Sequence, residues 1–63
     1  MNFTATLKNW TIVKAGDSLF LKGNAFGHIN PDYAEDGDLI VTSAILAGRD
    51  GYVVTCCGSY KVE

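Results

Sequence analysis

The chain has 63 residues, a formal net charge of −2 and a hydrophobic fraction of 48%. This length allows one domain, residues 1–63, and the hydrophobic fraction excludes a disordered chain. The five cations are scattered, and nucleic-acid affinity rests mainly on neutralising phosphates, so the composition disfavours a nucleic-acid partner.

Strand signals begin near the N-terminus, where residues 3–7 alternate between apolar and polar side chains. The phase of this alternation shifts by one residue at Lys8-Asn9, which predicts a bulge or a turn there. Residues 10–14 are rich in β-branched and aromatic side chains, so we expect the strand to continue after the shift.

The next segment is a predicted return strand over residues 18–26, which follows a turn at Ala15-Gly16-Asp17. Gly23 stands in the middle of this strand and predicts a bend or the close approach of another backbone. Residues 27–38 carry turn residues at both ends and form a long loop, and loops of this length are often functional.

The C-terminal part contains further strand signals separated by glycines. A strand is predicted over residues 39–46, a tight connection at 48–51, a strand over 52–57, a kink at Gly58 and a last short strand over 59–62. No window has the three- and four-residue spacing of apolar residues that a helix needs. We therefore predict an all-β fold, a four- to five-stranded antiparallel meander that closes into a small, SH3-like open barrel.

A core this small only narrowly offsets the cost of ordering the chain, so an additional source of stability is expected. The two cysteines, Cys56 and Cys57, are neighbours, and a bridge between adjacent residues closes no useful loop. Within a strand they point to opposite faces, which predicts one buried and one exposed thiol. No metal or cofactor is expected, because His28 is the single histidine and a zinc site requires four ligands. Self-association is the source that remains, and we expect a homo-oligomer.

The sequence has no apolar segment of the length found in signal peptides or membrane spans. Structural disulfides are rare in the cytoplasm, and the cysteines here are not arranged to form one. We therefore expect a cytoplasmic protein without a membrane partner.

Several residues of the 27–38 loop are of types that carry chemistry. Its four acids lack the alternating spacing and the central glycine of an EF-hand, so a calcium loop is not predicted. His28 beside Cys56 or Cys57 would supply the base and nucleophile of a thiol hydrolase. A thiol inside a strand, however, lacks the cationic neighbour or helix N-terminus that activates it. We expect a non-enzymatic protein in which His28 hydrogen-bonds the loop.

A cluster of hydroxyl groups is the second candidate site. If strands 39–46 and 52–57 pair across their tight turn, Thr42 and Ser43 lie nearly opposite Thr55. The alternatives are an ordinary cross-strand threonine pair and a polar patch that binds a ligand or a partner subunit. The candidate binding residues, the border of the patch included, are Asn24, His28, Thr42, Ser43, Thr55, Ser59 and Tyr60.

Three stretches of the chain resemble a group of very short phage and prophage proteins. The stretches are LKNWTIVKAGDSLFLKGNAFGH, DGDLIVTSAIL and CCGSYKV. They share with that group a tryptophan strand, a Gly-Asn-x-x-Gly-His segment, an Asp-Gly-x-x-Ile-x-Thr-Ser segment and a Gly-Ser-x-Tyr ending. This chain departs from the group at Val41, where a histidine often stands, so a role for a second histidine does not carry over.

The resemblance implies a compact accessory protein that is made in an infected cell and acts in the host cytoplasm by binding. We therefore predict a non-enzymatic binding module of phage or mobile-element type. It would act as an oligomer that inhibits a host defence protein or sequesters a small signalling molecule. The alternatives are a small barrel that stacks single-stranded nucleic acid on its aromatic residues and a structural accessory protein of a virion.

Overall fold

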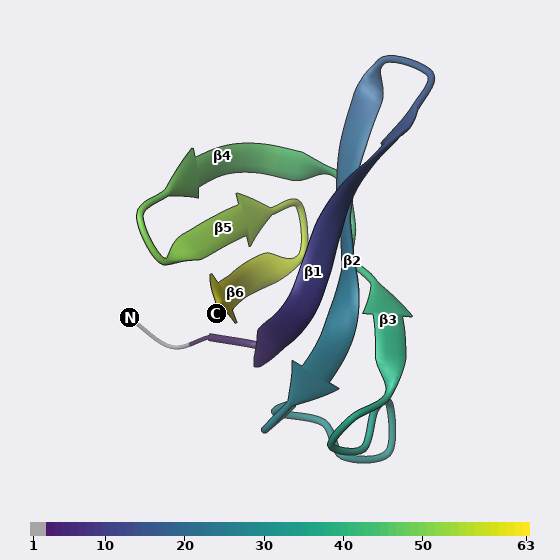
Figure 1. Ribbon diagram of the computed structural model, residues 1–63, viewed down its shortest axis with the longest axis vertical. Helices are drawn as coiled ribbons and strands as arrows, with labels where there is room; N and C mark the ends of the chain where they lie inside the picture. Colours follow the sequence, from purple (N-terminus) through teal and green to yellow (C-terminus); the bar gives the residue numbers. More distant parts are fainter. Residues whose placement is uncertain (1–2) are drawn as a thin grey trace.

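The computed structural model describes residues 3–63, which form one sheet of six strands and no helix (Figure 1). The strands are β1 (Ala5–Ala15), β2 (Ser18–Phe26), β3 (Leu39–Val41), β4 (Ile45–Arg49), β5 (Tyr52–Thr55) and β6 (Gly58–Val62). Their order across the sheet is β3-β2-β1-β6-β5-β4, with β1 and β6 parallel and the other neighbours antiparallel. The all-β prediction is confirmed. Within the described residues there is no helix long and apolar enough to cross a membrane.

The predicted four- to five-stranded antiparallel meander in an SH3-like barrel is wrong, because the sheet is mixed, has six strands and is not closed. The cause is a break at residues 42–44, inside the segment 39–46 that was expected to be one strand. Its first half, β3, pairs with β2, and its second half, β4, pairs with β5. The chain therefore passes from one edge of the sheet to the other between these halves, and β6 returns beside β1 in the parallel direction.

The long β1–β2 hairpin contains the predicted bulge. The register shifts between Lys8 and Thr11, and Asn9 adopts a left-handed backbone with φ 52°, which asparagine tolerates better than most residues. The bulge keeps Leu7 and Ile12 on the same face of the sheet, opposite Ala25 and Leu21 of β2, because the extra residue offsets the change of phase in the sequence. The close approach at Gly23 is confirmed as well, since a Cβ atom there would lie 3.0 Å from Cβ of Trp10.

Two tight turns agree with their sequence signals. Gly16 joins β1 to β2 with φ 61°, and Gly51 joins β4 to β5 with φ 86°, both in the left-handed region that glycine adopts without a Cβ penalty. The third turn differs from the prediction, because Cys56 and Cys57 form the connection between β5 and β6 instead of the end of a strand.

The Thr55 hydroxyl closes this cysteine turn. It donates a hydrogen bond to the carbonyl of Gly58 at 2.9 Å and accepts one from the backbone N–H of Cys57 at 3.3 Å. Both cysteine thiols are free and exposed, so the expected division into one buried and one exposed thiol is wrong. That expectation required the cysteines to alternate along a strand, and residues in a turn do not alternate.

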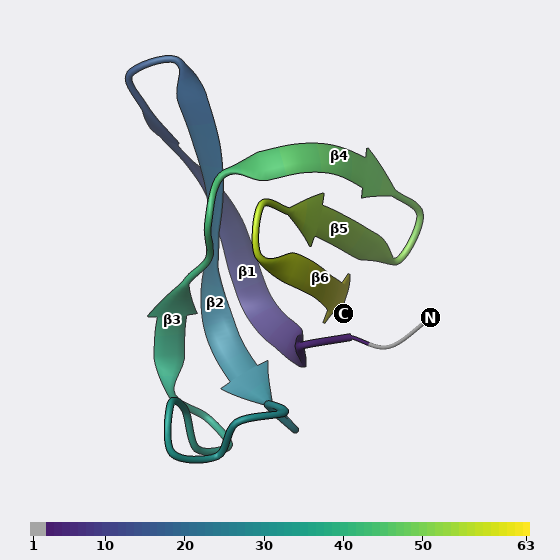
Figure 2. The same cartoon turned by 180° about the vertical axis from the view of Figure 1, so that it is seen from behind.

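The core lies on one face of the sheet. Its buried apolar residues are Ala5, Leu7, Leu21, Ala25, Ala34, Ile40, Val53 and Tyr60. Figures 1 and 2 show the β1–β2 hairpin extending past the other strands at one end, and the loop between β2 and β3 folding back at the other end. The core therefore gathers near the loop end of the hairpin, and this end is able to enclose a site.

Candidate ligand-binding site

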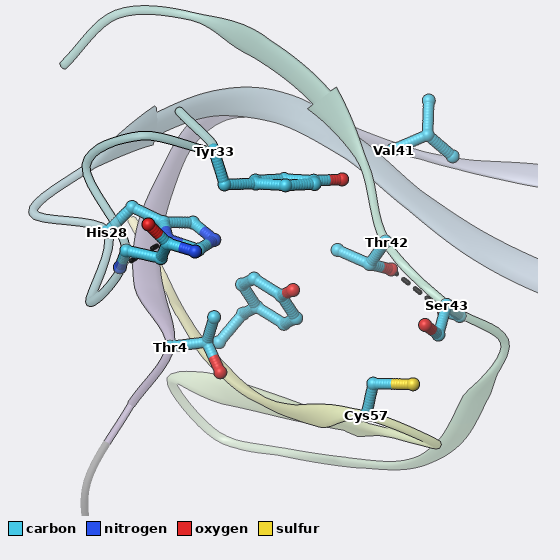
Figure 3. A pocket seen from close by; sticks show the side chains of 9 residues that line it. Thr4, His28, Tyr33, Val41, Thr42, Ser43 and Cys57 are labelled. Carbon is cyan, nitrogen blue, oxygen red and sulfur yellow. Dashed lines mark hydrogen bonds between the residues drawn. The ribbon is translucent and has the colours of Figure 1, made fainter. Parts of the chain in front are cut away.

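A pocket of about 310 Å³ opens between the 27–38 loop, the connection from β3 to β4 and the start of β6. It is lined by Thr4, His28, Asn30, Tyr33, Val41, Thr42, Ser43, Cys57 and Tyr60. Figure 3 shows labelled side chains around an open space, with His28 and Tyr33 from the loop on one side and Thr42, Ser43 and Cys57 on the other. Segments far apart in the sequence thus build the pocket together.

Hydrogen bonds to its own acids and to the sheet fix the shape of the loop. Asp36 Oδ1 accepts from the backbone N–H of Gly27 at 2.8 Å, and Asp38 Oδ2 accepts from that of Glu35 at 2.9 Å. The N–H of Gly37 donates to the β2 carbonyl of Ala25 at 2.7 Å. The described residues hold no group of three His, Cys, Asp or Glu side chains that could bind a metal. As these hydrogen bonds show, Asp36 and Asp38 act as backbone acceptors that hold the loop.

The loop presents a stacked pair of rings to the pocket. The rings of His28 and Tyr33 have centroids 5.0 Å apart and an interplanar angle of 28°. The backbone N–H of Asn30 donates to Nδ1 of His28 at 2.9 Å, which agrees with the expectation that His28 hydrogen-bonds the loop. Since Nδ1 accepts, the neutral ring carries its proton on Nε2, and Nε2 is the donor that remains for a ligand.

The opposite wall comes from the break between β3 and β4. Thr42 Oγ1 accepts from the backbone N–H of Leu21 at 3.2 Å and donates to the Ser43 carbonyl at 2.9 Å. The buried hydroxyl of Thr42 therefore replaces the strand pairing that is lost at the break. The Ser43 hydroxyl makes no hydrogen bond to another described residue, so it is available to a ligand at the pocket wall.

Tyr60 belongs to both the hydrophobic core and the lining of the pocket. The residue is 7% exposed, and burial raises the pKa of its hydroxyl above 10.0, with smaller contributions from Tyr33 and Cys57. No buried side-chain nitrogen or oxygen among the described residues lacks a hydrogen-bond partner. The Tyr60 hydroxyl has no such partner in the described chain, so it reaches the open space of the pocket, where a ligand can meet it.

The titratable side chains of the lining are those of histidine, tyrosine and cysteine. None of the nine is a lysine, arginine, aspartate or glutamate. His28 and Cys57 lie at opposite sides of the pocket in Figure 3, and no hydrogen bond joins them among the described residues.

Four of the seven predicted binding residues line the pocket, namely His28, Thr42, Ser43 and Tyr60. The other three have structural contacts elsewhere. Asn24 Nδ2 donates to the Gly37 carbonyl at 3.0 Å, and the Ser59 carbonyl accepts from the N–H of Thr4 at 2.7 Å. Thr55 closes the cysteine turn.

The predicted pairing of Thr42 and Ser43 with Thr55 is wrong. Thr55 stands opposite Ile45 in the β4–β5 ladder, and Thr42 lies in the break before that ladder begins. The prediction assumed one continuous strand over 39–46, and the break moves its two halves to different neighbours.

The remaining lining residues, Thr4, Asn30, Tyr33, Val41 and Cys57, were not predicted. Asn30 and Tyr33 belong to the long loop, whose length was the available signal. Thr4 and Cys57 come from segments that meet only in the folded chain, and nothing in their local sequence marks them.

Comparisons with protein families, with curated proteins and with solved structures find no match to this chain. The resemblance to short phage and prophage proteins therefore stays a prediction, and the geometry of the pocket carries the functional argument.

Proposed function

We propose that this protein is a non-enzymatic binding module that takes up a small, uncharged, planar molecule in the pocket. The observation that carries this proposal is the stacked pair of His28 and Tyr33, which faces free hydroxyl groups across a lining without charged residues. Flat rings stack on such a pair, and the hydroxyls select the hydrogen-bonding edge of the ligand.

The pocket volume sets the size of the ligand. At about 310 Å³ it stands at the lower end of small-molecule pockets, which run from about 300 to 1,000 Å³. A heterocycle of one or two rings fits such a space.

The lining also indicates which ligands bind poorly. Phosphate groups are bound by Arg and Lys side chains or by a helix N-terminus, and the described pocket offers neither. A nucleoside or free base therefore suits it better than a nucleotide. Single-stranded nucleic acid, which shares the stacking bases, needs cations along its backbone, and the chain carries a net charge of −2.

We infer that the protein sequesters its ligand and does not convert it, because no nucleophile and base are paired in the described lining. Each of the polar groups positions a ligand, and none is placed to activate a nucleophile. The resemblance to phage proteins implies that the sequestered molecule comes from the host cell, which corresponds to the predicted sequestration of a small signalling molecule.

The experiment is a calorimetric titration with adenine, uracil, nicotinamide, adenosine and AMP. We expect at least one of the neutral compounds to bind in a 1:1 ratio and AMP to bind no more tightly than adenosine. Tyr33→Ala should weaken binding about fivefold to a hundredfold, because stacking on an aromatic ring contributes about 1–3 kcal/mol per base.

The matched control is Ile29→Ala, in the same loop. Ile29 is 72% exposed and lies outside the lining, so its removal should leave the affinity unchanged. The proposal is overturned if no neutral compound binds, or if Tyr33→Ala binds as well as the unaltered protein. Tight binding of a labelled single-stranded oligonucleotide at low salt would instead support the nucleic-acid alternative.

A further inference from the structure

The far end of the β1–β2 hairpin is a two-stranded ribbon, which no third strand joins within residues 3–63. We call its residues 9–20 the arm. β6 pairs with β1 only at Ala5–Leu7, and β3 pairs with β2 only at Lys22–Asn24. Figures 1 and 2 both show this end of the hairpin projecting alone. Isolated two-stranded ribbons are marginally stable in water and gain stability from a further strand.

The arm is apolar for a segment so open to solvent. Residues 8–17 are all exposed, although several of them are apolar. Trp10 is 40% and Ile12 51% exposed, and the arm also holds the exposed apolar residues Val13 and Leu19. Clustered apolar groups of this kind mark an interaction surface. Lys14 is the cation of the arm, and it forms no ion pair with another described residue.

Backbone direction shows which groups of β1 face the unpaired edge. The backbone N–H and C=O groups of Leu21 and Ala25 in β2 form their hydrogen bonds on the side opposite to β1, with Thr42 and with residues 37–38 of the loop. Alternate residues of a strand point opposite ways, so Phe20 bonds toward β1, at its register partner Val13. Ile12 precedes Val13 and therefore directs its N–H and C=O to the open edge of β1. Lys14, two residues further along, does the same.

We infer that the arm pairs with the arm of a second copy of this chain, with the two β1 strands antiparallel about a two-fold axis at Ile12. In this register Ile12 meets Ile12 of the partner subunit, and Trp10 meets Lys14 of the partner subunit. The pattern Trp-x-Ile-x-Lys is thus self-complementary, with one cation–π pair on each side of a central apolar pair. A two-fold axis at Lys14 would set two ammonium groups opposite each other, which disfavours that register.

The size of the arm sets an upper limit on the surface that the dimer buries. A stable interface buries about 800 Å² per partner, which is about a fifth of the 4076 Å² surface of this chain. The arm holds 12 of the 63 residues, most of them exposed, so its whole surface is about this large. Pairing of the two β1 edges covers only part of it, which predicts a weak and reversible dimer. An isologous pairing also covers the open edge of both copies at once, and exposed edges are otherwise prone to aggregation.

Sedimentation equilibrium of the full chain tests this inference. We expect a reversible dimer, and Ile12→Glu should weaken it by more than about tenfold, because it sets two carboxylates opposite each other at the axis. Leu46→Glu is the matched control, since Leu46 is 66% exposed and lies on β4, which pairs with β5 and not with β1. This control should leave the dimer intact.

Spin labels give the geometry. In a Cys56→Ser/Cys57→Ser background, labels at Thr11→Cys, an exposed position beside the axis, should lie closer together across the dimer than labels at Leu46→Cys. A monomer at all concentrations, a dimer that survives Ile12→Glu, or a dimer lost in Leu46→Glu overturns the inference. The pocket lies outside the arm, so failure of the dimer and failure of ligand binding are measured separately.

Discussion

The two ends of the β1–β2 hairpin differ in what covers them. At the loop end, β3, β6 and the 27–38 loop bury Leu7 and Ala25, and a pocket forms beside them. At the other end, similar strand residues such as Ile12 and Val13 remain exposed. The chemistry of the strand residues alone therefore does not decide their burial. The covered end of the hairpin contributes to the pocket, and we propose that the uncovered end presents its edge to a second chain.

The largest expected effect contrasts two cross-strand partners of the hairpin. Leu21 is fully buried, whereas its register partner Ile12 is half exposed. Leu21→Ala should lower the free energy of unfolding by about 2–5 kcal/mol, as buried leucine truncations do. Ile12→Ala should lower it by less than about 1 kcal/mol in dilute solution, where the chain is monomeric. Urea denaturation followed by tryptophan fluorescence measures both, and equal losses would contradict the contrast between the two ends.

A smaller effect is expected for the close approach beside the pocket. A Cβ atom on Gly58 would collide with the Thr4 side chain, whereas one on Gly48 would meet nothing within 4 Å. Gly58→Ala should therefore destabilise the protein by about 1–3 kcal/mol, and Gly48→Ala by no more than about 0.5 kcal/mol. Thermal denaturation of the two variants provides the comparison. A neutral Gly58→Ala would show that the pocket end is loosely packed.

The loop tether gives the next effect. Asp36→Ala removes the acceptor of the Gly27 N–H and should cost about 1 kcal/mol of stability, together with a loss of ligand affinity, because the Tyr33 wall is no longer held. Asp32→Ala in the same loop removes a carboxylate that accepts no hydrogen bond from a described residue, so it should change neither quantity. If both variants behave alike, the loop is not fixed by its acids.

The smallest effect is a dependence on alkaline pH. Burial raises the pKa of Tyr60 above its value of 10.0 in the unfolded chain. The unfolded state therefore loses the proton first as the pH rises, and the stability that the protonated Tyr60 contributes is present below pH 10 and falls above it. Tyr60→Phe should flatten this fall in denaturation curves between pH 9 and 11. An unchanged slope in Tyr60→Phe would assign the effect to other groups.

Sequence patterns predicted the local features of this fold well. The bulge after Lys8, the close approach at Gly23 and the turns at Gly16 and Gly51 all depend on residues within one hairpin. The strand order was not predictable in this way. It depends on the break at Thr42, whose hydroxyl hydrogen-bonds Leu21 from the neighbouring strand, and period-2 alternation does not report that contact.

The candidate site was predictable in part for the same reason. His28 stands out as the single histidine, and Thr42, Ser43 and Tyr60 as polar groups near strand ends. Their assembly into one pocket depends on the loop that brings Tyr33 against His28, a contact set by the hydrogen bonds of the folded loop. The expected threonine pairing failed because it was built on a strand that the structure divides.

The most direct test of the account is a set of two-dimensional amide NMR titrations on one isotope-labelled sample. Adding the neutral heterocycle that binds best in calorimetry, at fixed protein concentration, should shift resonances around His28, Tyr33 and Ser43 and leave the arm unchanged. Diluting the protein without ligand should do the reverse, with shifts around Ile12 and Lys14. Ligand-induced shifts confined to the arm, or no shifts at the pocket, would contradict the claim that the covered end of the hairpin forms the binding site.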